Sequence, residues 1–207
     1  MAATGPARND RRQTDYGFVS WRIDQGTSGN DGGFFQYTGT PCSGGSCPGW
    51  VEIDDNPTTR GTFAAGATAL DQMHNDGSVW QFIGPACSGT CPGWLEIDDN
   101  SLTGWIVAGS ALYQQHTDRS IWQYAGTPCN GTSCPGWFEL DDNPNTGNRE
   151  IFAGQGTVYQ LHESDASVWQ YTGTPCNGTS CPGWVRLDDN TSTWNIVAGP
   201  ANFYPNE

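Results

Sequence analysis

Three histidines and four acidic triplets are the side chains in this sequence with the clearest potential for chemistry. The histidines recur at one position in successive segments: His74, His116 and His162. Each triplet reads Asp-Asp-Asn, and the four copies span residues 54–56, 98–100, 141–143 and 188–190. Such groups can serve as general base and general acid when their surroundings give them different pKa values. Because every candidate here recurs in equivalent surroundings, the pattern favours several equal binding sites over one active site, and we expect no enzymatic activity.

The triplets could also hold a cation or form turns. Asp and Asn side chains bond to nearby backbone groups in turns, and proline follows two of the four triplets. A Ca²⁺ site needs six or more oxygen ligands, whereas adjacent Asp residues in a strand point to opposite faces, so one triplet cannot supply such a site alone. We therefore interpret the triplets as turns, keep calcium as the alternative, and expect neither a metal nor a cofactor.

Tryptophan is abundant, with ten residues in 207, and it can serve two purposes. In a core it buries a large apolar area, and in a cleft its ring can stack on the apolar face of a sugar while polar side chains bind the hydroxyl groups. We expect most tryptophans to pack in the core and at least one per repeat to lie near an exposed cleft. The predicted ligand-binding residues are Trp80, Trp122, Trp169, His74, His116, His162, Asp98, Asp141 and Asp188.

The elements that position these residues repeat with a period of about 45 residues. The recurring sequence CPGW ends with Trp50, Trp94, Trp137 and Trp184, which are 44, 43 and 47 residues apart. Each full repeat has four strand-like pieces separated by turn residues, as in TFAAG, ALDQMH, VWQFIG and GWLEIDD between residues 62 and 99. This is the content of a propeller blade, so the sequence predicts an all-β fold, a four-bladed β-propeller with four antiparallel strands per blade.

The two ends of the chain predict how such a ring closes. The first repeat lacks an inner strand, whereas NIVAG at residues 195–199 is a spare one. We expect a flexible tail over residues 1–15 and one propeller domain over residues 16–207. The expected repeats span residues 16–59, 60–103, 104–147 and 148–193. Residues 194–204 would complete the first blade by pairing with its N-terminal strand, so that no sheet edge stays unpaired.

A ring of only four blades has a narrow axis, which must be lined by small side chains. Ala-Gly pairs recur at the end of each inner strand, at residues 65–66, 108–109, 153–154 and 198–199. We expect these pairs to meet where the inner strands converge, while the alternative is that the glycines only end the strands.

Eight cysteines form four pairs that recur in phase with the repeats. The expected disulfides are Cys42–Cys47, Cys87–Cys91, Cys129–Cys134 and Cys176–Cys181. The partners are four or five residues apart around a glycine turn, a spacing that can bring two Cα atoms within disulfide reach. Zinc is the alternative, but it needs four ligands and each pair lies in the loop of a different blade.

Disulfides indicate an oxidising compartment, so we expect a secreted, extracellular protein, with a cytoplasmic location as the alternative.

Charge and hydropathy exclude several classes of partner. The formal net charge is −14, lysine is absent, and three of the eight arginines lie within the first 12 residues. Nucleic acids and anionic membranes need a clustered positive face, so we expect neither as a partner. No apolar run is long enough to cross a bilayer, so we expect no membrane insertion, and residues 1–17 contain no apolar core typical of a signal peptide.

Several motifs recur together in this cycle. Between residues 106 and 142 the chain reads IVAG, LYQQHTD, IWQY and GWFELDD in order, and this arrangement resembles tectonin-type β-propeller lectins. The cysteine-containing pattern TGTPC…CPGW is similar to propeller repeats attached to secreted microbial proteins. The resemblance covers about residues 16–204 and implies a propeller fold and sugar binding. The chain departs from the pattern where the first repeat lacks the histidine, where Asp71 replaces a tyrosine, and where Arg186 replaces a glutamate.

Together these patterns predict a carbohydrate-binding, lectin-like protein that recognises glycans or glycoconjugates multivalently at its blade junctions. One alternative is a secreted scaffold that presents one face to a protein partner. A second is an enzyme that acts on polysaccharide at a site broken out of symmetry by the irregular first repeat.

Overall fold

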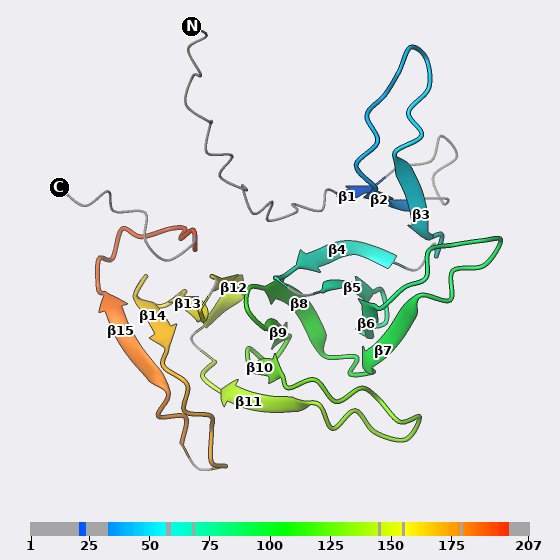
Figure 1. The fold of residues 1–207 in the computed structure, drawn as a ribbon. Coiled ribbons are helices and arrows are strands. Elements are labelled where there is room, and N and C mark those ends of the chain that lie inside the picture. Colours follow the sequence, from blue (N-terminus) through cyan, green and yellow to red (C-terminus); the bar gives the residue numbers. More distant parts are fainter. Residues whose placement is uncertain are drawn as a thin grey trace, which may run out of the picture.

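The computed structural model describes residues 21–23, 33–56, 59–67, 69–144, 146–154, 156–178 and 180–198. Over these residues the chain forms antiparallel β-sheets and no helix (Figure 1), which confirms the prediction of an all-β fold. Consequently these residues contain no helix that could span a membrane. The predicted tail, residues 1–15, lies outside the described residues.

Four sheets follow one another along the chain, and each keeps its strands in chain order. The first sheet comprises β1 (Trp21–Ile23), β2 (Phe34–Tyr37) and β3 (Trp50–Asp54). The second comprises β4 (Thr59–Ala65), β5 (Leu70–His74), β6 (Val79–Phe82) and β7 (Trp94–Asp98). The third comprises β8 (Thr103–Ala108), β9 (Leu112–His116), β10 (Ile121–Tyr124) and β11 (Trp137–Asp141). The fourth comprises β12 (Thr146–Ala153), β13 (Val158–His162), β14 (Val168–Tyr171) and β15 (Trp184–Asp188).

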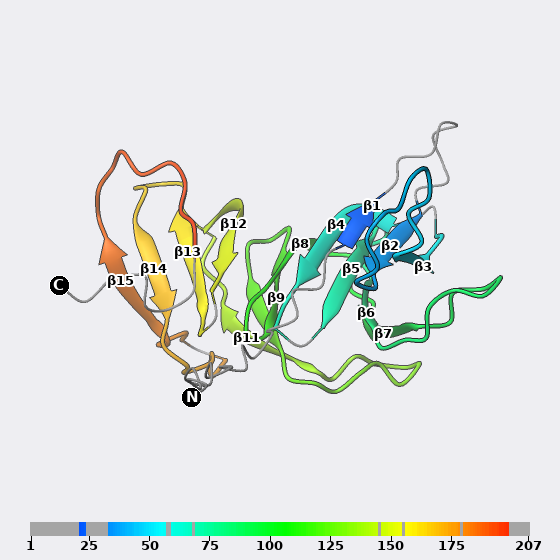
Figure 2. The same ribbon diagram turned by 45° about the horizontal axis from the view of Figure 1, so that its top comes forward.

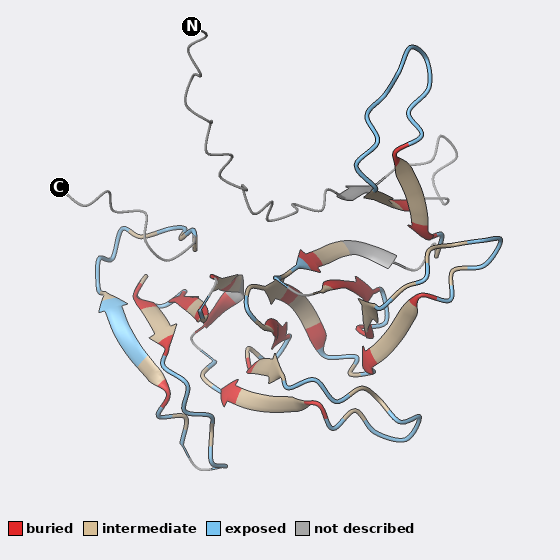
Figure 3. Ribbon diagram, viewed as in Figure 1, coloured by how far each residue is buried: buried red, intermediate tan, exposed pale blue. Residues whose placement is uncertain are grey.

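Strands at the same place in each sheet carry the same residue pattern, so each sheet is one sequence repeat. The third strands of the four-stranded sheets read VWQF, IWQY and VWQY. Their register against the fourth strand is the same each time, with a bulge after the first residue. The second strands β5 and β9 are buried at all five positions, because other strands of their sheet flank them and neighbouring sheets cover their faces (Figure 3).

Neighbouring sheets are joined by the CPGW tryptophans. The indole Nε1 of Trp94 donates a hydrogen bond of 2.7 Å to the carbonyl of Ile53, in the preceding sheet. Trp137 and Trp184 repeat this bond at the next two junctions, to the carbonyls of Ile97 and Leu140, at 2.7 and 2.8 Å. The acceptor residues have fully buried side chains, so these bonds lie inside the structure and fix how one sheet sits on the next.

A second bond joins the cysteine loops of the second, third and fourth sheets to the sheet that precedes each of them. The backbone amides of Cys87, Cys129 and Cys176 donate to the carbonyls of Glu52, Glu96 and Glu139, at 2.9, 3.2 and 3.0 Å. The loop between the third and fourth strands therefore reaches over the outer strand of the sheet before it. This position explains why nearly the same loop sequence occurs in each repeat.

All four predicted disulfides are present, and the described residues contain no free cysteine. The bonded pairs have Cα atoms 4.0–4.2 Å apart, across loops with a sequence separation of four or five. The prediction of disulfides in place of zinc thiolates is thereby confirmed. Four disulfides in a chain of this size are typical of extracellular proteins.

The inner strands converge closely at their Ala-Gly ends. A Cβ atom on Gly109 would lie 1.9 Å from the carbonyl oxygen of Gly154, so only glycine fits this approach. Gly66 in turn lies against the carbonyl oxygen of Gly109, which also accepts a hydrogen bond of 3.0 Å from the Ala67 amide. A cavity of about 490 Å³ lies beside these ends, lined by β4, β8, β12 and residues 195–198.

The sheets form an open array, with the first sheet and β15 at opposite ends (Figures 1 and 2). Residues 195–198 are described but belong to no strand, and the predicted pairing of residues 194–204 with the first blade is not formed by the described part of this segment. Leu187 on β15 is 53% exposed, whereas its counterparts Ile53, Ile97 and Leu140 are completely buried by the following sheet. The closed four-bladed ring therefore stays a prediction.

Removing one indole N–H should weaken the attachment of one sheet to the next. We expect Trp137→Phe to lower the free energy of unfolding by about 1–3 kcal/mol, because the carbonyl of Ile97 then stays buried without this donor. Chemical denaturation monitored by circular dichroism measures the change. Trp194→Phe is the matched control, since Trp194 is 84% exposed. An equal and small effect of both substitutions would contradict the role given to the buried bond.

Candidate functional site

Each predicted histidine lies against the predicted tryptophan of the same repeat. The ring centroids of His74 and Trp80 are 5.5 Å apart with an interplanar angle of 20°. The other two pairs, His116–Trp122 and His162–Trp169, have separations of 5.5 and 5.4 Å and angles of 22°. The histidines are 93–95% buried, whereas the tryptophans are half-buried. The histidine therefore supports one face of an indole ring that remains partly accessible.

A short relay of hydrogen bonds fixes each of these indole rings. Trp80 donates from Nε1 to the hydroxyl of Ser78 at 3.0 Å, and that hydroxyl donates to the Asp76 carboxylate at 2.7 Å. The same relay holds Trp122 through Ser120 and Asp118, and it holds Trp169 through Ser167 and Asp165. Sequence reasoning missed these positioning residues, although the recurring DGS, DRS and DAS before each tryptophan were a visible signal.

Burial decides the protonation of the histidines. It lowers the pKa of His74 below the usual value, and the nearby carboxylates of Asp54 and Asp76 only partly oppose this effect. Burial likewise lowers the pKa of His116 and His162. The three rings are therefore neutral at physiological pH, which suits a supporting role beneath the tryptophan better than the binding of an anion.

The acidic triplet beside each His–Trp pair comes from the preceding repeat. At the first junction, a cavity of about 530 Å³ is lined by Asp54, Asp55 and Asn56 of the first sheet together with Gln72, His74, Trp80, Cys91 and Trp94 of the second. The sequence places Asp98 in the same repeat as Trp80, but Asp98 ends the outer strand β7 and faces the third sheet, where its carboxylate accepts a hydrogen bond of 3.0 Å from Thr103 on β8. The reason is that the cysteine loop of the following sheet lies over the end of each outer strand.

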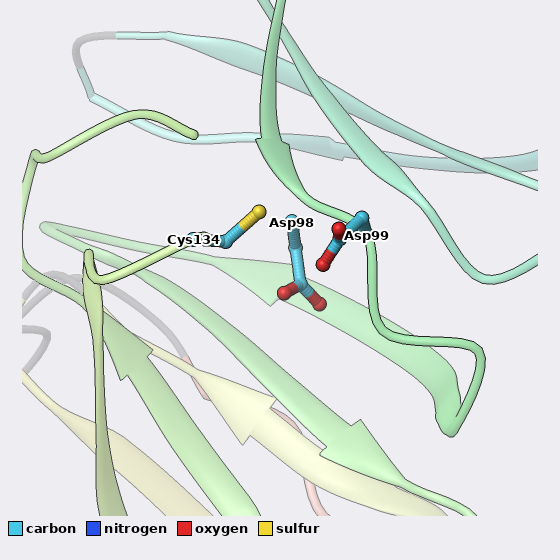
Figure 4. Close-up of side chains that lie close together, drawn as sticks. All are labelled: Asp98, Asp99 and Cys134. Carbon is cyan, nitrogen blue, oxygen red and sulfur yellow. The ribbon is translucent and has the colours of Figure 1, made fainter. Parts of the chain in front are cut away.

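The same junction geometry recurs further along the chain. Ligand atoms of Asp98, Asp99 and Cys134 lie within 4.8 Å of one another, and Cys134 belongs to the loop of the next repeat (Figure 4). Asp141, Asp142 and Cys181 form the equivalent group one junction later. Both sulfur atoms are in disulfides and cannot act as thiolate ligands. Each group thus offers two carboxylates, fewer ligands than either calcium or zinc needs.

Carboxylates accumulate in these junctions. The pKa of Glu96 is raised, first by burial and then by the neighbouring carboxylates of Asp99, Asp76 and Asp98. Glu139 has a raised pKa for the same reasons, with Asp142, Asp118 and Asp141 as its neighbours. In the fourth repeat the corresponding position is Arg186, which pairs with Asp165 at 3.6 Å. The second and third repeats therefore contribute a strongly negative surface, and the fourth a mixed one.

Asp188 has different surroundings from the other predicted acids. It accepts a hydrogen bond of 3.0 Å from the hydroxyl of Thr193, as Asp98 does from Thr103, but it is only half-buried, whereas Asp98 and Asp141 are buried. No described sheet follows β15, so the structure brings no His–Trp pair to this triplet. The first sheet carries Phe35 at the tryptophan position.

At each junction, the acidic triplet of one repeat and the His–Trp pair of the next line a space that we call the junction groove. One further carboxyl lies outside these grooves. Asp71 is 98% buried near the start of β5, and its Oδ1 accepts a hydrogen bond of 2.9 Å from the Gln81 amide. Burial raises the pKa of Asp71 to about 7, and the bond from Gln81 offsets only part of this effect. At neutral pH this carboxyl therefore opposes folding.

Comparison of the chain with models of known protein families gives no match. Comparison with curated proteins also finds no similar sequence.

The Asp71 carboxyl should give stability a specific dependence on pH. Because its pKa is higher in the folded than in the unfolded protein, its destabilising effect is absent below about pH 4, grows as the pH rises, and is complete above about pH 7. We expect Asp71→Asn to raise the free energy of unfolding by up to about 4 kcal/mol at pH 8 and to change it little at pH 4.

Thermal unfolding of both proteins between pH 4 and 8 measures this difference. Asp189→Asn, at an exposed position, controls for the loss of one negative charge. A gap between wild type and Asp71→Asn that is equal at both pH values would contradict a buried carboxyl with a raised pKa.

Proposed function

We propose that this protein binds glycans at the junctions between its sheets and does not transform them chemically. The observation that carries the proposal is the recurring half-buried tryptophan. A histidine stacks on one face of its ring, a serine accepts a hydrogen bond from its Nε1, and carboxylates of the preceding repeat lie beside it. A fixed aromatic ring next to hydrogen-bonding carboxylates suits a pyranose, whose apolar face stacks while its hydroxyl groups donate to the acids.

The charge of the junctions supports a preference among glycans. Burial, and then the neighbouring carboxylates, raise the pKa values of Glu96 and Glu139. A sialylated or sulfated glycan would add negative charge to this surface, which is unfavourable. The proposed ligands are therefore neutral glycans rich in hydroxyl groups.

The same repetition supports the proposed lack of catalysis. The three His–Trp pairs have nearly the same geometry, and burial lowers the pKa of each histidine. A general acid and a general base must instead differ in environment. Several equal sites on one rigid chain suit multivalent binding, because tethered sites meet a clustered glycan at high effective concentration.

In this proposal the four sheets are blades of a closed four-bladed propeller. Support comes from the junction contacts, which are the same three times over, and from β15, whose apolar side chains Val185 and Leu187 are 44% and 53% exposed. Trp50 and Cys42 of the first repeat occupy the sequence positions that make these contacts elsewhere. Residues 195–198 already line the same cavity as the inner strands of three sheets, where a fourth inner strand would belong.

Secretion and tectonin-like ancestry are parts of the same proposal. Four disulfides support an oxidising, extracellular location, where glycans and glycoconjugates are abundant. The resemblance of the repeats to tectonin-type lectins supports sugar binding by the same kind of blade.

A glycan array followed by calorimetry with the best-bound glycan tests the function. We expect neutral glycans to bind and their sialylated or sulfated forms to bind weakly, with one site at each of the three junctions that have a His–Trp pair. Trp80→Ala, Trp122→Ala and Trp169→Ala should each remove about one site, because each removes one stacking surface.

Trp194→Ala is the control, since Trp194 is exposed and belongs to no His–Trp pair. A single site that none of the three substitutions alters would shift the function to a scaffold for a protein partner. Turnover of a bound polysaccharide that one substitution abolishes would show an enzyme.

Ring closure has its own test. Deleting residues 193–207 should lower the melting temperature strongly in a closed ring, because the deletion exposes strand edges and the apolar face of the first and fourth sheets. Deleting residues 1–15 is the control, since the sequence places them outside the domain. A melting temperature within about 2 °C of the full chain after the first deletion would show that the ring is open in solution.

A further inference from the structure

A second kind of cavity lies between the second and third sheets, away from the His–Trp groove. Its volume is about 230 Å³, and its polar lining residues are Asp71, Gln81, Ser110 and Tyr124. Asp71 and His74 stand three residues apart on β5, about 10 Å along the strand, so this cavity opens near the opposite end of the sheet from the groove. It is not part of the proposed glycan-binding surface.

The fold does not require a carboxylate at position 71. Tyr113 and Tyr159 occupy the same place on β9 and β13, and each is paired with a glutamine on the next strand as Asp71 is paired with Gln81. The next junction has an equivalent cavity of about 560 Å³, which Tyr113, Gln123 and Tyr171 line. A phenol therefore satisfies this position in two other repeats, and Asp71 breaks the symmetry.

The Asp71 carboxyl has no cationic neighbour to balance it. Its hydrogen bond comes from the neutral amide of Gln81, and among the described residues no arginine or histidine bonds to it. Lysine is absent from the whole chain. Tyr124, the other titratable side chain in the lining, is itself disfavoured as an anion, because burial and then Asp71 raise its pKa. A buried carboxylate without a cation is costly, so the cavity suits a ligand that supplies a positive charge.

We propose that this cavity binds an amino sugar with a free amine, whose ammonium group pairs with the carboxylate of Asp71. The volume is below the 300–1,000 Å³ or so typical of sites for drug-sized ligands, which fits one monosaccharide unit. Gln81, Ser110 and Tyr124 can bond the hydroxyl groups of that unit, while Asp71 selects against the neutral sugar of the same size. This site is independent of the grooves and takes a different ligand.

Titration of the full chain with glucosamine and with glucose, at pH 7 by calorimetry, tests the proposal. The two sugars differ at one position, where glucosamine carries an ammonium group. We expect glucosamine to bind at least about tenfold more tightly than glucose, with one site, and Asp71→Asn to reduce its affinity to that of glucose. Equal binding of the two sugars by the wild type, or an unchanged preference in Asp71→Asn, would overturn the proposal.

Two more variants and one spectrum distinguish a site at Asp71 from a general attraction of amines to an acidic chain. Asp71→Tyr introduces the residue that the next two repeats already carry, and it should also abolish the preference for glucosamine; if it does not, the proposal fails. Asp189→Asn, at an exposed position, should keep the preference, and its loss there would show a nonspecific attraction of amines to a chain of net charge −14. In nuclear magnetic resonance spectra, glucosamine and not glucose should shift the side-chain amide of Gln81, and an unmoved amide would place binding elsewhere.

Discussion

The bond from the CPGW indoles of Trp94, Trp137 and Trp184 to a buried carbonyl of the preceding sheet is the contact on which the rest of the array depends. A sheet of four short strands cannot bury both of its faces by itself, so its stability comes from its neighbours. Because each bond joins one donor atom to one acceptor atom, it fixes the register between sheets to a single residue. In the chain-entropy model a disulfide across so short a loop stabilises the folded state by only about 2 kcal/mol. Its main effect is therefore to hold the loop in the shape that brings two donors to the preceding sheet, the tryptophan indole and the amide of the first cysteine.

This fixed register also creates the grooves. Once the cysteine loop lies over the end of an outer strand, the acidic turn after that strand must lie beside the His–Trp pair of the following repeat. The tryptophan keeps its orientation because a serine and an aspartate hold its edge and a buried histidine supports its face. Packing between sheets and the geometry of the site thus have one common cause.

The sequence was sufficient for the features that recur at one spacing. The period, the strand content, the cysteine pairs and the Ala-Gly ends all follow from residues that repeat in phase, and the structure has the corresponding sheets, disulfides and close glycine contacts. What the sequence could not give was the partner of each residue across a junction. Asp98 and Trp80 belong to the same repeat, and only the position of the loop from Cys129 to Cys134 shows that Asp98 faces the third sheet. The cavity around Asp71 was hidden for the same reason, since its walls come from two repeats.

Each groove is divided between two repeats, one supplying the acids and the next supplying the aromatic ring. A gene for such a protein can grow by tandem duplication of one internal repeat. Every added copy then supplies an aromatic ring to the groove before it and an acidic turn to the groove after it. A substitution in one copy alters a single junction and leaves the others as they are, and the aspartate at position 71, where the next two repeats have tyrosine, is a difference of this kind. Modular inheritance of this kind lets specificity diversify one junction at a time without disturbing the contacts between sheets.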